Sequence, residues 1–194
     1  MFFVRQFVDE KRDNILVRVE GSLPPAEGGK LLLFEAHQDT VPVTDMTIDP
    51  WLPTILNGRI YGRGSCDIKG GLAAMLGAIE HLHRERPVGR PTVVLACTVN
   101  EENGCTGAAA LTKLWERGES LNSALFERPP CAAVVAEPTL LQVVVAHKGA
   151  LRWRCHTHGR AAHTSRPQLG KNAISKWPKC SPRWRSTSVT WHHI

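Results

Sequence analysis

The chain has 194 residues, 42% of them hydrophobic and 22% charged, a composition typical of a globular protein that can bury a substantial core. No apolar run approaches the roughly 18 residues of a membrane-spanning helix, and Asp9 and Glu10 follow the first eight residues too soon for a secretory signal. These features argue against a membrane partner and predict a cytoplasmic location.

The net charge of +6 is unevenly distributed along the chain. Residues 1–137 hold all 18 acidic side chains and 14 of the 24 basic ones, a net charge of −4, whereas residues 138–194 hold the other ten basic side chains and no acidic one. Such a basic segment can contact nucleic acid, anionic lipid or an acidic substrate. Because it carries no signature of a nucleic-acid-binding fold, we expect no nucleic-acid partner.

Six cysteines are scattered without a C-x-x-C pair, and most have small or apolar neighbours. This pattern predicts buried free thiols in a reducing compartment over a disulfide framework.

The first half of the chain predicts strands joined by loops. A single strand is expected over Asn14–Glu20 and a loop over residues 21–30. The continuous apolar run Leu31–Phe34 is typical of a strand buried on both faces. After a proline-rich connection come a short segment, Gly58–Tyr61, and a glycine-rich turn around Asp67.

Helical spacing then continues to about Arg84, and a third apolar run occupies Pro91–Val99. A second helix is predicted from Thr106, as N-cap, to Gly118, as C′ glycine. A fourth apolar run, Cys131–Ala136, follows it.

A further strand is predicted over Leu141–His147. From Leu151 to His156 apolar and polar residues alternate, as in a strand with one wet face. We therefore expect one domain over residues 1–149 and the start of a second over residues 150–174, with a helix beginning at Lys171–Ile174. Residues 175–194 contain prolines and no apolar periodicity, and we interpret them as an aberrant or non-native tail.

Three apolar runs end in residues that can bind metal: His37 and Asp39, then Glu101 and Glu102, then Glu137. Open α/β sheets collect their sites at the carboxyl ends of strands, so these residues are expected to converge, with Asp67 joining them. One histidine and several carboxylates suit a hydrolytic zinc site, and an excess of carboxylates suits two metals that share a bridging ligand.

Residue type suggests a role for each of these groups. Asp67, placed by its turn, is the natural bridge, and Asp39 can hold or orient the His37 ring. Of the adjacent Glu101 and Glu102, one can ligate while the other acts as general base. Glu137 would be a terminal ligand.

Each residue alone also has a structural interpretation. Asp67 can cap its helix, Glu137 can be a turn acid before Pro138, and Glu101–Glu102 can be a solvated loop start.

Six segments of the sequence, in this order, resemble the successive motifs of the M20 metallopeptidase and deacylase family. That family includes acetylornithine deacetylase, succinyl-diaminopimelate desuccinylase, aminoacylase-1 and glutamate carboxypeptidase. The segments are His37–Pro42, Gly62–Gly71, Asn100–Gly104, Ala136–Thr139, His147–Gly149 and Gly159–Pro167.

The resemblance implies two zinc ions, with cobalt or manganese as possible substitutes. His37, Asp67 and Glu137 would bind one ion, and Asp67 with Glu102 the other. Glu101 would be the general base. His163 would steady the oxyanion of the tetrahedral intermediate. The peptide bond after Asp67 is expected to be cis.

The resemblance also implies a fold: a zinc-exopeptidase-like α/β domain whose mixed sheet is flanked by helices, followed by the start of a ferredoxin-like α+β lid and dimerisation domain. The resemblance implies a further histidine ligand for the second metal, for which we expect no counterpart up to residue 194. We also expect no counterpart in this sequence of the helices that precede the family's first strand. Complete members are homodimers, a state that we do not expect of this chain.

The implied function is hydrolysis of the amide bond of an N-acyl amino acid, with a substrate like that of acetylornithine deacetylase. The alternatives within the family are a dipeptidase, a carboxypeptidase or the desuccinylase. An alternative of another class is a catalytically dead, metal-binding remnant.

Overall fold

The computed structural model describes residues 1–116, 125–146, 148–149 and 156–176, and the chain divides into two compact units, residues 1–144 and 145–194. Three of the sequence predictions fall wholly or mostly outside the described residues. They are the C′ glycine Gly118, the strand at 151–156 except its last residue, and the tail at 175–194 except its first two residues.

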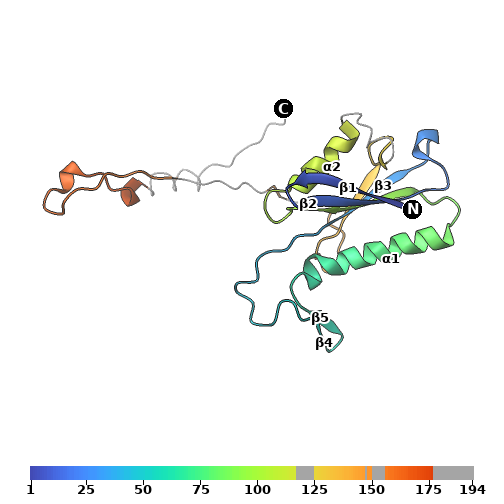
Figure 1. Cartoon of the computed structure of the whole chain (residues 1–194), viewed down its shortest axis with the longest axis horizontal. Helices are drawn as coiled ribbons and strands as arrows, with labels where there is room; N and C mark the ends of the chain where they lie inside the picture. The colour runs from blue at the N-terminus through green and yellow to red at the C-terminus, as the bar shows by residue number, and fades with distance from the viewer. Residues whose placement is uncertain (117–124, 147, 150–155, 177–194) are drawn as a thin grey trace. The chain divides into compact units, whose positions relative to one another are not determined.

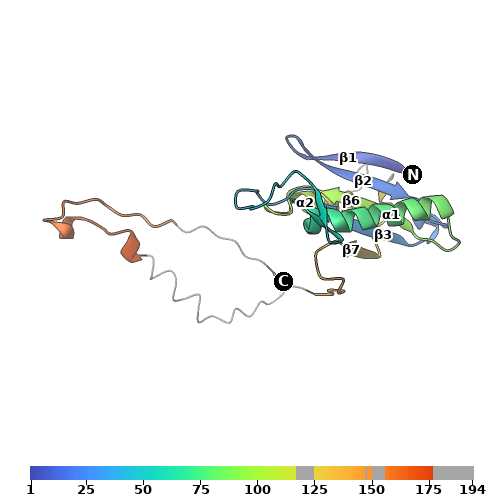
Figure 2. The ribbon, with the colours of Figure 1, turned by 90° about the horizontal axis from the view of Figure 1, so that it is seen from below.

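The first unit contains a five-stranded mixed sheet with the strand order β1-β2-β6-β3-β7 (Figures 1 and 2). Its strands are β1 (Phe2–Asp9), β2 (Arg12–Val19), β3 (Leu31–His37), β6 (Thr92–Thr98) and β7 (Ala132–Val135). The strands β3, β6 and β7 are parallel to one another, whereas β2 runs antiparallel to both β1 and β6. This arrangement confirms the predicted α/β class.

Two helices cover the sheet, α1 (Gly70–Glu85) on one face and α2 (Thr106–Glu116) on the other (Figure 1). Every residue of the central strand β6 is buried, and successive side chains point to opposite faces. The core on the α2 side contains Val94, Ala96, Leu111 and Leu114. The core on the α1 side contains Val93, Leu95, Met75 and Ile79.

The prediction of one strand before the first loop was wrong, because residues 2–19 form the hairpin β1-β2. β1 lies at the edge of the sheet, and Gln6 is its single buried residue, so it shows no clear apolar face in the sequence. Gln6 is buried because its side-chain amide donates a hydrogen bond to the carbonyl of Ala110 in α2 (2.8 Å).

Two further predictions were wrong. No strand forms over residues 141–146, where Leu141 is fully exposed and both Leu140 and Leu141 have positive φ. β-branched residues alone do not make a strand without a neighbour to pair with. No helix begins at Lys171 either: this residue pairs with Arg160 in an isolated bridge, and a short 3-10 turn, η4 (Ile174–Lys176), follows.

The described part of the chain also contains several short elements. They are η1 (Pro25–Glu27), the hairpin of β4 (Thr54–Leu56) and β5 (Arg59–Tyr61), the turn η2 (Ser65–Lys69), and η3 (Pro167–Leu169).

The predicted burial of the cysteines was wrong for most of those described. Cys66, Cys97, Cys105 and Cys131 are free, but Cys97 alone among these four is buried. In the described part of the chain, no helix has the length and apolar character to cross a membrane.

Candidate metal centre

Three parallel strands deliver the candidate ligands to one edge of the sheet. His37 is the last residue of β3, Glu101 and Glu102 follow the end of β6, and Glu137 follows the end of β7. The pairing of His37 with Thr98 in the β3–β6 ladder places these strand ends side by side. The convergence expected at the carboxyl edge is therefore what the fold produces.

Asp67 reaches the same place from the turn η2, directly before α1. Gly64 precedes the turn with φ +74°, a conformation that favours glycine, and its carbonyl accepts a hydrogen bond from the amide of Lys69 (2.8 Å). The buried side chain of Ile68 anchors the turn, and the peptide bond between Asp67 and Ile68 is cis, as the resemblance implied.

His37 belongs to both of the two groups of possible ligands, and it is only 3% exposed. One group consists of His37, Asp67 and Glu137, and the other of His37, Glu101 and Glu102. Within each group, one candidate ligand atom from each residue lies within 4.8 Å of the others. Glu137 is exposed and the Asp67 side chain is 51% exposed, so the first group opens towards solvent.

The two ring nitrogens of His37 have different partners. Nδ1 is 2.8 Å from the backbone carbonyl oxygen of Asp39, which can only accept, so Nδ1 carries a proton. Nε2 is 3.0 Å from Oδ1 of Asp67, also an acceptor when ionised. The contact between Nε2 and Asp67 therefore requires a second ring proton, or a cation bound by both groups.

The pKa values of His37 and Glu137 are both raised above their ordinary values. Burial lowers the pKa of His37, but the hydrogen bonds to Asp67 and Asp39 and the negative charges of Asp67 and Glu137 outweigh it, so the net shift is upward. Burial, followed by repulsion from the Asp67 carboxylate, raises the pKa of Glu137. A negatively charged cluster that holds extra protons is one in which a divalent cation can replace them.

The residues present fit a divalent metal ion. An imidazole nitrogen and carboxylate oxygens are the ligand types of hydrolytic zinc sites, and the mutually repelling carboxylates of Asp67 and Glu137 favour a cation between them.

Sequence reasoning missed Glu35, which lies two residues before His37. Its carboxylate accepts a hydrogen bond from the Thr98 hydroxyl (2.5 Å), and its burial raises its pKa in spite of that bond. The sequence signal that could have indicated Glu35 is a carboxylate directly after the apolar run Leu31–Phe34 and two residues before His37.

His163 belongs to the second unit, residues 145–194. Its Nδ1 accepts a hydrogen bond from the Ser165 amide (3.2 Å) and lies 2.8 Å from the Ser165 hydroxyl, and the side chain is exposed. Its predicted role towards the oxyanion stays a prediction.

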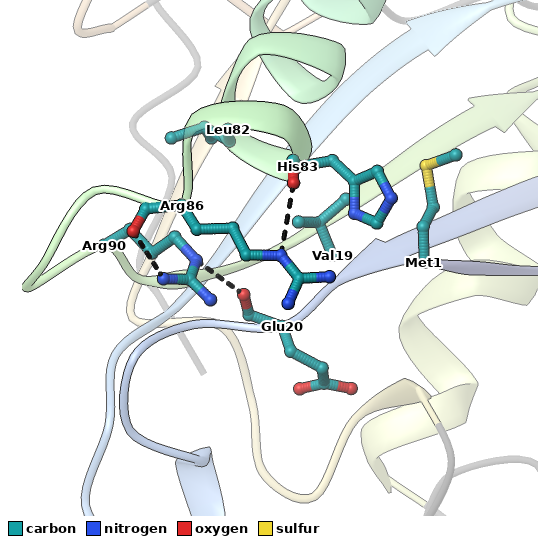
Figure 3. Close-up of a pocket in the computed structure, with 7 residues that line it drawn as sticks. All are labelled: Met1, Val19, Glu20, Leu82, His83, Arg86 and Arg90. Atoms are coloured by element: carbon teal, nitrogen blue, oxygen red, sulfur yellow. Dashed lines mark hydrogen bonds between the residues drawn. The ribbon is translucent and has the colours of Figure 1, made fainter.

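A separate pocket of about 210 Å³ lies at the opposite end of β6, beside the last turn of α1 (Figure 3). Arg86 donates to the carbonyl of His83 (3.4 Å), and Arg90 donates to the carbonyls of Arg86 (3.1 Å) and Glu20 (3.1 Å). The bonds to His83 and Arg86 satisfy carbonyls at the C-terminus of α1, and the bond to Glu20 reaches the residue after β2, so backbone carbonyls account for both arginines. The lining residues are Met1, Val19, Glu20, Leu82, His83, Arg86 and Arg90.

Three solved structures are similar to this chain. A tripeptidase from Staphylococcus aureus is 21% identical with a TM-score of 0.55, over 88% of this chain and 42% of that one. Human carnosine dipeptidase 1 is 24% identical with a TM-score of 0.46, over 63% and 25%. An M20 family metallo-carboxypeptidase from Sulfolobus solfataricus is 30% identical with a TM-score of 0.35, over 44% and 19%.

The chain thus spans less than half the length of each of these structures, and its likeness to the tripeptidase is one of fold. A family model described as peptidase family M20/M25/M40 matches residues 33–192. This range covers the α/β unit from β3 onwards and all the candidate ligands. The protein therefore belongs to peptidase family M20/M25/M40.

Proposed function

We propose that this chain carries the metal-binding part of a hydrolase that cleaves the amide bond of N-acyl amino acids or small peptides. The observation that carries the proposal is that His37 meets two pairs of acidic residues at the carboxyl edge of the sheet. One pair is Asp67 and Glu137, the other is Glu101 and Glu102, and in each set the candidate ligand atoms lie within 4.8 Å of one another. Membership of a peptidase family supports hydrolysis of an amide bond.

In this proposal, His37, Asp67 and Glu137 would hold one zinc ion, and Asp67 with Glu102 would contribute ligands to a second. A bound divalent cation supplies Lewis-acid chemistry and makes water a better nucleophile. Glu101 would accept the proton of the attacking water, the role that its position in the family motif implies. His163 steadies the oxyanion.

The proposed substrate is an N-acyl amino acid of the kind that acetylornithine deacetylase uses. Small peptides are the second substrate class, since the family is one of peptidases. We place the activity in the cytoplasm.

The test is a hydrolysis assay of the zinc-loaded chain with a panel of N-acetyl amino acids and dipeptides. We expect Glu101→Gln to lower kcat by about 10²–10⁴-fold while zinc remains bound, because the general base is lost. Glu80→Gln is the matched control, since Glu80 is an exposed acid on α1 that forms an ion pair with Arg84 (3.7 Å). Turnover by Glu101→Gln at the wild-type rate would remove Glu101 as the base.

Zinc binding without turnover of any panel member would instead identify the chain as a metal-binding remnant. Cobalt and manganese should be tested beside zinc, because carboxylate-rich sites accept all three ions.

A further inference from the structure

The carboxylate of Asp39 joins two segments that are distant in the sequence. Its Oδ1 accepts a hydrogen bond from the backbone amide of Glu101 (3.1 Å), and its Oδ2 accepts one from the backbone amide of Glu102 (3.2 Å). One side chain beyond the end of β3 thus binds both amides of the acidic pair beyond β6.

The same residue orients His37 through a different atom. The backbone carbonyl of Asp39 accepts the hydrogen bond from His37 Nδ1 at 2.8 Å. The carboxylate Oδ1 lies 3.7 Å from Nδ1, beyond hydrogen-bond distance. The backbone of Asp39 therefore orients the imidazole, while its side chain is engaged with the Glu101–Glu102 backbone.

The loop that carries the acidic pair is tight and is held at its base. Asn100 and Cys105 both have positive φ, and the amide of Cys105 donates to the carbonyl of Asn100 (2.7 Å). The buried Asn14 side chain binds the two flanks of the loop: it accepts from the amide of Val99 (3.1 Å) and donates to the carbonyl of Gly107 (2.9 Å).

Asp39 binds the tip of the same loop, where Cys105 Sγ also lies 3.5 Å from the carbonyl oxygen of Glu101. Charge-assisted hydrogen bonds from adjacent amides fix the backbone from which the Glu101 and Glu102 side chains diverge. The second group of candidate ligands, which His37 shares with these two glutamates, depends on that backbone position.

We propose that Asp39 is a positioning residue that holds the Glu101–Glu102 loop at the metal cluster through both of its carboxylate oxygens. The hydrogen bonding stands on the contacts above. Its consequence for metal binding rests on the proposed function.

The test uses Asp39→Asn in the full chain, because asparagine keeps the shape but replaces one acceptor oxygen with an NH₂ donor that faces a backbone N–H. We expect hydrogen exchange at the Glu101 and Glu102 amides to accelerate by about tenfold or more, while the ¹⁵N shift of His37 Nδ1 stays unchanged. Unchanged protection of both amides would overturn the proposal.

Asp49→Asn is the matched control, because Oδ1 of Asp49 accepts from the amides of Trp51 (2.9 Å) and Leu52 (3.2 Å) in an exposed turn. This variant should change exchange at residues 51 and 52 and leave residues 101 and 102 as in the wild type.

A second measurement needs no variant and so does not depend on its folding. In the wild-type chain, scalar couplings across hydrogen bonds should connect the amide nitrogens of Glu101 and Glu102 to Cγ of Asp39. Couplings to any other acceptor would overturn the assignment.

Zinc titration then separates this inference from the proposed function. We expect Asp39→Asn to bind zinc about 10–100-fold more weakly than the wild type, the usual cost of losing a residue that supports a ligand. A wild-type chain that binds no zinc would defeat the proposed function and leave the NMR result on Asp39 standing. Wild-type zinc affinity in Asp39→Asn would show that the loop position does not matter for the metal.

Discussion

At the scale of single residues, the centre of the site is His37, which both groups of candidate ligands include. It is also the most constrained of them, because one ring nitrogen is bound to the Asp39 carbonyl and the other faces Asp67. A ligand whose ring is fixed in this way loses little entropy when it binds a metal.

His37→Ala should therefore weaken zinc binding by more than about 100-fold, a larger effect than the loss of a supporting residue. Isothermal titration calorimetry measures this change. His81→Ala is the matched control, since His81 is exposed on α1. Equal zinc affinities of the two variants would contradict the placement of the metal at His37.

The stability of the metal-free protein should fall as the pH rises. The pKa values of Glu35, Glu137 and His37 are all raised above their ordinary values, 4.5 for the carboxyls and 6.5 for the imidazole. The folded state then binds more protons than the unfolded state, so the free energy of unfolding decreases with pH. The decrease begins above about pH 4.5 for the carboxyls and continues above about pH 6.5 for His37.

Urea denaturation at about pH 5 and about pH 8, with a chelator present, measures this effect. Glu35→Gln should flatten the dependence, because one of the contributing carboxyls is removed while the Thr98 hydroxyl keeps an acceptor. If the free energy of unfolding changes equally with pH in the variant and the wild type, Glu35 does not contribute to the pH dependence of stability.

At the scale of elements, the close approach of α1 to the end of β7 brings Asp67 and Glu137 together. A Cβ atom added to Gly71 would lie 2.8 Å from Cβ of Ala136, the residue directly before Glu137. Glycine is therefore required at this position for packing, since real Cβ atoms do not approach so closely.

Gly71→Ala should destabilise the protein by about 1–3 kcal/mol, the usual cost of overpacking, and should weaken zinc binding by displacing Glu137. Gly77→Ala is the matched control in the same helix, because nothing lies within 4 Å of its added Cβ. This control should stabilise the protein by about 0.5–1 kcal/mol, since alanine is the better helix former. Equal stability of the two variants in thermal denaturation would exclude the steric explanation.

At the scale of the whole molecule, both groups of candidate ligands in the described part of the chain include the same histidine, His37. One histidine cannot serve two metals with its single available nitrogen, Nε2. The two groups therefore compete for one ring.

We expect one tight zinc equivalent per chain, bound by His37, Asp67 and Glu137, with the second position weak or empty. Calorimetric titration measures the stoichiometry. Glu137→Gln should weaken the tight site more than Glu102→Gln does, because Glu137 is a proposed ligand of that site whereas Glu102 only lies beside it. Two tight equivalents per chain would contradict this expectation.

The helices α1 and α2, the strands β3, β6 and β7, and the acidic and histidine side chains that meet at their ends could be predicted from the sequence. The buried strands β3 and β6 are continuous apolar runs, and acidic or histidine residues follow them directly, so local pattern was sufficient. The segment at 141–146 has the same apolar character and forms no strand, because a strand depends on a partner that local sequence does not reveal.

How the site residues are held depends on contacts between distant parts of the folded chain. The bonds from the Asp39 carboxylate to the amides of Glu101 and Glu102 join residues 62 and 63 positions apart, and no sequence spacing indicates them. The partners of Glu35 and Asn14 are of the same kind, since each follows from strand register and helix docking. Local sequence specifies which chemical groups reach the edge of the sheet, because residue type and strand ends are local properties. Which atom binds which depends on contacts that exist only after the chain has folded.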